Sequence, residues 1–287
     1  MSWKESAVGV LAKLLRPGAR AGFAAALLSW LLRTAAPRRR VAEQNLRIAL
    51  PEASKEERRR ILKGTYDHLV WMGIEFIMLQ DDPSLVLDWV EAENISLLDS
   101  LVGKGAIFIS GHVGNWELGV AWLAQSGYNL TSIVRESSDP NERGLIERMR
   151  SRVGVRTMPK TTPMTRAASL LRRGEFLGIL TDQHGGPEGI PSRFFGIETS
   201  TSQGAAVFAW LTKKPIIPIF THRIAPCRHA IRVGSPIEWQ PLGSRDETIS
   251  HITDLVNLTM ERMVLESPEQ WLAQHRRFRE HYKNMGI

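Results

Sequence analysis

Residues 106–118 read A-I-F-I-S-G-H-V-G-N-W-E-L, with a histidine and a glutamate shortly after an apolar run. The run Ala106 to Ser110 predicts a buried strand, and Asn115 is a suitable N-cap for a helix that follows. His112 would then lie in the turn and Glu117 in the first turn of the helix. We interpret the pair as a general base and its partner. A carboxylate that accepts the Nδ1–H of histidine leaves Nε2 free to take a proton from a hydroxyl.

The spacing of this pair disfavours a metal site. Zinc ligands on one helix face lie four positions apart, whereas five positions correspond to about 500° of rotation, roughly 140° from the same face. The chain has a single cysteine, Cys227, and neither an H-E-x-x-H nor a phosphate-binding G-x-x-x-x-G-K-[ST] motif, so we expect no metal and no cofactor. No G-x-S-x-G motif supplies a serine nucleophile, so the nucleophile would come from the substrate. Gly111 and Gly114 predict a tight turn that a substrate can approach closely.

The simpler interpretation of the pair is an ordinary strand-end histidine and an ordinary first-turn acid, because H-x4-E alone is a weak pattern. Its setting makes the pattern more specific. Four apolar runs, at residues 106–110, 130–134, 176–180 and 216–220, alternate with helical stretches at 116–125, 141–153, 165–172 and 201–211, and residues 247–266 form a further helix. This order predicts an α/β fold with a mostly parallel central sheet flanked by helices. Active sites of such sheets lie at the carboxyl ends of the strands.

The first 40 residues differ from the rest. The apolar run from Ala21 to Leu32 is shorter than the ~20 residues of a membrane-spanning helix. Arg33 and Arg38 to Arg40 follow it, which is typical of helices that lie in one leaflet with arginines among lipid phosphates. A buried helical hairpin is the alternative. We therefore divide the chain into a membrane-associating segment, 1–40, and a catalytic domain, 41–287, with a helical lead-in over 41–84.

The formal net charge is +7, which favours anionic partners. The stretch 143–173 is rich in arginine and has acidic residues only near its start, so it is a candidate surface for an acidic protein or a phosphate-bearing lipid. A solvated helix face is the alternative. No nucleic-acid-binding motif is present, so we expect no nucleic acid partner.

Six segments together resemble a known family. G-H-V-G-N-W-E-L resembles the HxxxxD/E motif of glycerolipid-type acyltransferases, and more specifically that of the late acyltransferases of lipid A biosynthesis, the lauroyl/myristoyl transferases. The other segments follow in the family's order: N-L-R-I-A-L-P-E at 45–52, R-M-R-S-R-V-G at 148–154, G-I-L-T-D-Q at 178–183, F-F-G-I-E-T-S-T-S-Q-G at 194–204 and S-P-E-Q-W-L-A-Q-H-R-R-F at 267–278. The resemblance covers roughly residues 40 to 280.

The resemblance implies transfer of an acyl chain from an acyl-carrier-protein thioester to a hydroxyl of a lipid A precursor. The family works at the cytoplasmic face of the bacterial inner membrane, so the chain would be monotopic or held by one N-terminal anchor. His112 would be the general base and Glu117 its partner, and Arg150 and Asp182 match positions essential to the family, with Asp182 a candidate to pair with Arg150. The remaining candidates are supporting or substrate-binding residues, Asn115, Gly114 and Arg135, and acyl-groove residues, Trp116, Phe194 and Phe195.

Three alternatives remain open at this stage. The donor could be acyl-coenzyme A, with another glycolipid or a phospholipid as acceptor. The same dyad could activate water, which would make the protein a thioester or ester hydrolase. A basic, non-catalytic membrane-binding protein is the third alternative, and it predicts that His112 is dispensable.

Overall fold

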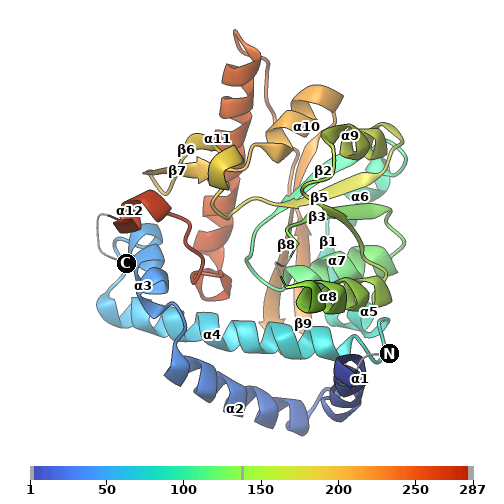
Figure 1. The fold of residues 1–287 in the computed structure, drawn as a ribbon, viewed down its shortest axis with the longest axis vertical. Coiled ribbons are helices and arrows are strands. Elements are labelled where there is room, and N and C mark those ends of the chain that lie inside the picture. Colours follow the sequence, from blue (N-terminus) through green and yellow to red (C-terminus); the bar gives the residue numbers. More distant parts are fainter. Residues whose placement is uncertain (1–2, 137–138, 284–287) are drawn as a thin grey trace.

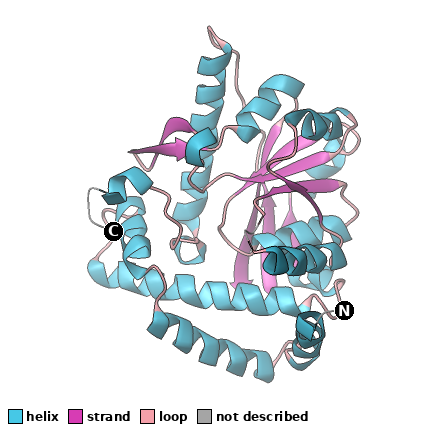
Figure 2. Cartoon of the chain, viewed as in Figure 1, coloured by secondary structure: helices cyan, strands magenta, loops and turns pink. Residues whose placement is uncertain are grey.

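The computed structural model describes residues 3–136 and 139–283. A seven-stranded sheet runs through the described part of the chain, with helices on both faces (Figure 1, Figure 2). In spatial order the strands are β1 (Val90–Glu93), β9 (Arg228–Val233), β8 (Ile216–Ala225), β2 (Ala106–Ser110), β5 (Phe176–Leu180), β3 (Leu130–Val134) and β4 (Arg156–Pro159).

The sheet is mostly parallel, as predicted. Strands β8, β2, β5, β3 and β4 run in one direction, whereas β9 pairs antiparallel with β8, and β1 runs parallel to β9. The predicted bounds of β2, β3 and β5 are confirmed, and β8 continues to Ala225 because it forms a hairpin with β9.

Two hydrophobic cores lie on the opposite faces of the sheet. One lies under α5 (Leu85–Trp89), α6 (Ile95–Leu101) and α7 (Trp116–Gln125), with α8 (Pro140–Arg152) beside β4. The other lies under α9 (Met164–Arg172), α10 (Gly204–Thr212) and α11 (Arg245–Glu266). The predicted helices 116–125, 141–153, 165–172 and 247–266 are confirmed to within two residues at each end.

The predicted start of the helix at residue 201 is wrong. Thr201 is the last residue of β7 (Ile197–Thr201), which pairs antiparallel with β6 (Ile190–Phe194) in a separate hairpin. The sequence I-E-T-S-T alternates side chains between two faces, which suits a strand, and α10 begins only at Gly204.

The N-terminal helices form a layer below the sheet. They are α1 (Trp3–Leu14), α2 (Ala19–Ala35), α3 (Arg39–Ala49) and α4 (Lys55–Met78). Ser54 caps α4 by accepting a hydrogen bond from the Glu57 N–H. Helix α2 packs along α4, which crosses the base of the view in Figure 1. Within residues 3–136 and 139–283, no helix combines the length and apolar character needed to cross a bilayer.

The C-terminal part returns to the N-terminal layer. It consists of a short turn, η2 (Pro268–Gln270), and α12 (Arg279–Lys283); another such turn, η1 (Gly186–Glu188), precedes the β6–β7 hairpin. Asn45 of α3 donates to the backbone carbonyls of Ala273 and His275, each at 2.7 Å. This contact joins the segment 45–52 to the segment 267–278, although more than 200 residues separate them in the chain.

Candidate active site

The site is built at the carboxyl ends of β2 and β5, which pair in parallel from Ala106 to Ser110. His112 follows β2 and Asp182 follows β5, so register alone brings the two side chains together. His112 Nδ1 lies 2.8 Å from Asp182 Oδ1. The carboxylate is almost fully buried, whereas the imidazole keeps 18% of its surface exposed. A base that must meet a substrate needs such exposure.

The tautomer of His112 follows from this contact. Burial opposes ionisation of Asp182, but the charge and hydrogen bonds of His112 outweigh burial and keep the pKa of this carboxyl below its ordinary value. An ionised carboxylate only accepts hydrogen bonds, so Nδ1 carries the proton and donates it. In the neutral imidazole, Nε2 is then the nitrogen that carries no proton, and the Gln183 side-chain amide lies 3.2 Å from it. Gln183 therefore donates to Nε2, the atom that can act as a base.

The predicted partner of His112 is wrong in this structure. Glu117 does not accept the Nδ1–H; its carboxylate instead forms a two-pronged ion pair with Arg150 of α8, at 2.5 and 3.0 Å. The predicted Asp182–Arg150 pair is wrong for the same reason. Burial lowers the pKa of Arg150, but the hydrogen bond and charge of Glu117 outweigh it and raise that pKa above its ordinary value. Glu117 and Asp182 have thus exchanged the partners that we expected for them: Asp182 pairs with His112, and Glu117 pairs with Arg150.

The turn between β2 and α7 is fixed by its backbone. The Gly114 N–H donates to Gln270 O at 3.0 Å, and His112 O accepts from the Leu272 N–H at 2.8 Å. Gly114 has a φ of +66°, and a Cβ there would lie 1.4 Å from Thr221 O. Glycine is therefore required for close approach of the β8 backbone, and approach of a substrate to this turn stays a prediction.

Asp182 has a second contact that the sequence did not predict. Trp271, in the segment 267–278, is buried and its Nε1 lies 3.3 Å from Asp182 Oδ2. The indole donates this hydrogen bond, since it carries only a donor. Trp271 thus holds the carboxylate from the side opposite His112.

Arg277 of the same segment is completely buried and closes the back of the site. It donates to Gln183 O at 3.0 Å, to Ser200 O at 2.6 Å and to Thr201 Oγ1 at 2.7 Å. These contacts join the segments 178–183 and 194–204 to the C-terminal one. Burial lowers the pKa of Arg277 to about 10, so it stays charged at neutral pH. The six segments that resemble the family therefore gather around His112. Each contacts the histidine's turn itself or another of the six segments that does.

An apolar pocket lies beside the histidine, between α7 and the sheet. Its empty volume is about 660 Å³, including its open mouth. Trp116, Glu117 and Arg150 are among its lining residues, and the Trp116 ring packs edge-on against His112 with centroids 4.7 Å apart. Its apolar lining comes from the strands, from α7 and from the loop before β4: Phe108, Val120, Leu123, Leu130, Val155 and Ile219.

The other predicted residues take different places. Asn115 is confirmed as the N-cap of α7, since its side chain accepts from the Leu118 N–H at 3.1 Å. Trp116 lines the pocket, but Phe194 and Phe195 do not; Phe194 is fully buried and both pack in the core under α10 and α11. Arg135 follows β3 with an exposed side chain.

Comparison with known proteins identifies the family of this chain. The family of bacterial lipid A biosynthesis acyltransferases matches residues 3–280. The chain is 24% identical over 251 residues to the lipid A biosynthesis palmitoleoyltransferase of Escherichia coli (strain K12), an alignment that covers 84% of this chain and 79% of that protein. The lipid A biosynthesis acyltransferase of Shigella flexneri matches to the same extent. The chain belongs to the bacterial lipid A biosynthesis acyltransferase family.

Proposed function

We propose that this acyltransferase moves a fatty acyl chain from an acyl-carrier-protein thioester to a hydroxyl of a lipid A precursor, with His112 as general base. The observation that carries the proposal is the hydrogen bond between His112 Nδ1 and the buried Asp182 carboxylate beside an apolar pocket. It leaves Nε2 unprotonated and accessible, as general-base catalysis requires. The His112–Asp182 pair replaces the His112–Glu117 dyad inferred from the sequence.

The reaction proceeds in two steps. The acceptor hydroxyl displaces Gln183 from Nε2, gives its proton to Nε2 and attacks the thioester carbonyl carbon. The oxyanion that forms accepts a hydrogen bond from the displaced Gln183 amide. The carbon–sulfur bond then breaks, the ester carbonyl re-forms, and the proton passes from Nε2 to the leaving sulfur, which departs as a thiol. No metal, cofactor or covalent acyl-enzyme takes part in this scheme.

Glu117 and Arg150 form the mouth of the pocket in this proposal. Their ion pair ties α7 to α8 and places a charged group between the apolar interior and solvent. The acyl chain enters past them and Trp116. Outside the mouth, the arginine-rich side of α8 is the surface on which an acidic acyl carrier protein would dock.

The floor of the pocket sets the acyl length that it accepts. Gly178 lies on the pocket face of β5, and a Cβ there would come within 3.4 Å of Leu130 and Ser132. Gly178→Val should therefore shift the preferred donor toward shorter chains. The valine would displace about two methylenes of a long acyl chain, each worth ~0.8 kcal/mol when buried. In the variant, kcat/KM for the long donor should therefore fall about tenfold relative to that for a donor two carbons shorter.

Competition between acyl donors of graded length measures this shift. Ser132→Ala is the matched control, because it alters the same pocket without adding volume, and it should not favour shorter donors. An unchanged length profile in a folded Gly178→Val protein would show that the acyl chain lies elsewhere.

The N-terminal layer presents an apolar surface that fits the membrane part of the proposal. Side chains of α1 and α2 are exposed although they are large and apolar: Val10, Leu11, Leu14, Phe23, Leu27, Leu28, Trp30 and Leu31. Phe23 is 74% and Trp30 58% exposed. Two exposed arginines lie where these helices meet, Arg16 between α1 and α2 and Arg20 in the first turn of α2. We propose that this surface rests in one leaflet of an anionic membrane, on the cytoplasmic side.

Replacing Phe23 and Trp30 together by serine should weaken binding to anionic vesicles by about 10²-fold or more, since each of the two side chains would lose ~1.5–3 kcal/mol of burial in lipid. Sedimentation with vesicles measures the partition. Leu258→Ser with Leu265→Ser is the control, because both side chains are about half exposed on α11, away from the apolar surface of α1 and α2. Equal losses in both double variants would contradict a specific membrane surface.

A turnover assay with purified protein in detergent tests the function itself. Acyl-carrier-protein thioester and a lipid A precursor should give an acylated glycolipid, and omission of the acceptor should abolish acyl release. Free fatty acid formed at an equal rate without acceptor would instead make the protein a hydrolase. A parallel reaction with acyl-coenzyme A identifies the donor, and loss of activity without the carrier protein is the expected result.

A further inference from the structure

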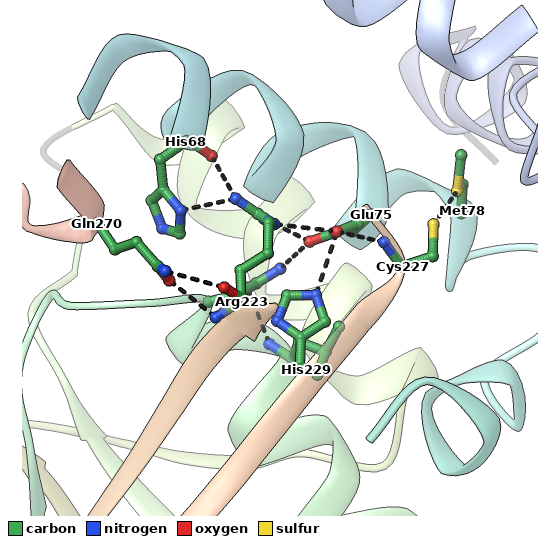
Figure 3. A network of polar contacts seen from close by, with 9 residues as sticks. His68, Glu75, Met78, Arg223, Cys227, His229 and Gln270 are labelled. Atoms are coloured by element: carbon green, nitrogen blue, oxygen red, sulfur yellow. Dashed lines mark hydrogen bonds and ion pairs between the residues drawn. The ribbon is translucent and has the colours of Figure 1, made fainter. Parts of the chain in front are cut away.

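A buried ionic network lies under the turn that carries His112 (Figure 3). At its centre is Glu75 of α4, whose side chain has no exposed surface. Arg223 of β8 binds it through Nη2 at 2.6 Å and Nε at 3.3 Å, and His229 of β9 lies 3.1 Å away. The backbone N–H of Cys227 also donates to the Glu75 carboxylate, at 2.9 Å. Helix α4 is thereby fixed to the β8–β9 hairpin.

The carboxylate of Glu75 stays charged in this setting. Burial would raise its pKa, but the hydrogen bond from His229 and the charge of Arg223 outweigh burial and lower the pKa to about 2. Arg223 also contacts His68 Nδ1 at 2.6 Å. Burial, and then the charge of Arg223, lowers the pKa of His68 to about 3, so His68 is neutral and accepts this hydrogen bond. The charged carboxylate of Glu75 therefore faces the guanidinium of Arg223, which His68 contacts as a neutral acceptor.

One contact of Glu75 leads directly to the catalytic turn. Asn115 Nδ2 donates to Glu75 Oε2 at 2.8 Å, while Asn115 Oδ1 accepts from the Leu118 N–H. Asn115 is fully buried, and it lies three residues after His112 and two before Glu117. The amide oxygen of Asn115 thus caps α7, and its amide nitrogen binds the ionic network.

The Glu75–Arg223 ion pair does not depend on the hydrogen bond from Asn115. The guanidinium already makes two contacts with Glu75, so the ion pair would persist without the asparagine. What the Asn115–Glu75 bond adds is a fixed position for the start of α7 relative to α4. His112 and Glu117 lie on either side of Asn115 in the chain, so both are attached to the segment that this bond ties to α4.

We propose that Glu75 is a positioning residue, which acts through Asn115 to hold the His112–Glu117 turn in its reactive geometry. The expected fall in kcat rests on the proposed function, whereas the expected effect on the order of the turn does not. Helix α4 also packs along α2, and its residues Leu69, Val70 and Ile77 line an open groove between the two helices. The catalytic turn and the apolar N-terminal layer are therefore attached to one helix.

Two variants of Asn115 separate positioning from capping. Asn, Asp and Ser are about equally good N-caps, so capping alone predicts that Asn115→Ser and Asn115→Asp behave as wild type. Neither variant can make the present bond to Glu75: the serine hydroxyl is too short, and the aspartate has no donor and repels the carboxylate. We expect kcat to fall about tenfold for Asn115→Ser and further for Asn115→Asp, with KM unchanged.

Hydrogen exchange provides a readout that does not depend on the reaction. Amides of residues 112–118 should exchange about tenfold faster in both variants, and those of α11 should not change. Ser244→Asn, which exchanges one good cap for another on α11, is the control and should alter neither exchange near His112 nor kcat. Wild-type kcat and exchange in both Asn115 variants would overturn the proposal. An inactive wild type would refute the proposed function alone, because exchange would still report on the turn.

Discussion

Replacing His112 by alanine should abolish acyl transfer almost completely while the protein remains folded. The imidazole is the general base in the proposed mechanism, and a positioned general base contributes ~10²–10⁴-fold to rate. The imidazole is only partly buried, and its removal leaves the backbone contacts of the turn with residues 270–272 in place. We therefore expect kcat to fall by about 10²–10⁴. The thermal midpoint should fall as well, because the buried Asp182 carboxylate loses His112 and keeps Trp271 as its side-chain donor.

The measurement is single-turnover transfer from acyl-carrier-protein thioester, with binding of the donor followed separately. His184→Ala is a useful control, because His184 pairs with Glu280 rather than with Asp182. It should retain most of the activity. If His112→Ala transfers acyl chains at the wild-type rate, His112 is an ordinary strand-end residue and the protein uses another base.

The local pattern was sufficient to predict the elements that carry the site. Apolar runs predicted β2, β3 and β5, because a strand buried on both faces is apolar along its length. Asn115 predicted the start of α7, because an N-cap is recognised from its own residue type and its neighbours. Strands β1, β4 and β9 were not predicted. They are four to six residues long, and charged residues such as Glu91, Arg156 and Arg232 interrupt their apolar pattern, so only pairing in the folded sheet reveals them.

The pairing of charged side chains could not be predicted in the same way. Glu117 is five positions from His112 in the chain, and Asp182 is seventy positions away, yet the distant residue makes the contact. Strand order decides this: β5 lies directly beside β2, and helical rotation carries Glu117 toward α8. Glu75 was missed for a related reason, since an acidic residue in an amphipathic helix gives no signal of burial until Arg223 is brought against it.

Asp182→Asn should cost nearly as much activity as loss of His112, and this prediction decides which carboxylate serves the histidine. The asparagine amide fits the same space but can donate a hydrogen bond to Nδ1. The ring then favours the tautomer with the proton on Nε2, which cannot accept one from the acceptor hydroxyl. Exchanging the corresponding acid of a serine protease triad lowers kcat by ~10⁴, and we expect a loss of about 10³-fold or more here.

Glu117→Gln is the matched variant, because it makes the same change from acid to amide in the other carboxylate. It weakens the ion pair with Arg150 but leaves the His112–Asp182 contact unchanged, so we expect a smaller loss, about tenfold, with a rise in KM for long donors. A downfield proton resonance from His112 Nδ1–H should persist in Glu117→Gln and vanish in Asp182→Asn. The opposite order of losses would mean that Glu117 turns to the histidine when substrate binds, and that the Arg150 pair belongs to the resting site only.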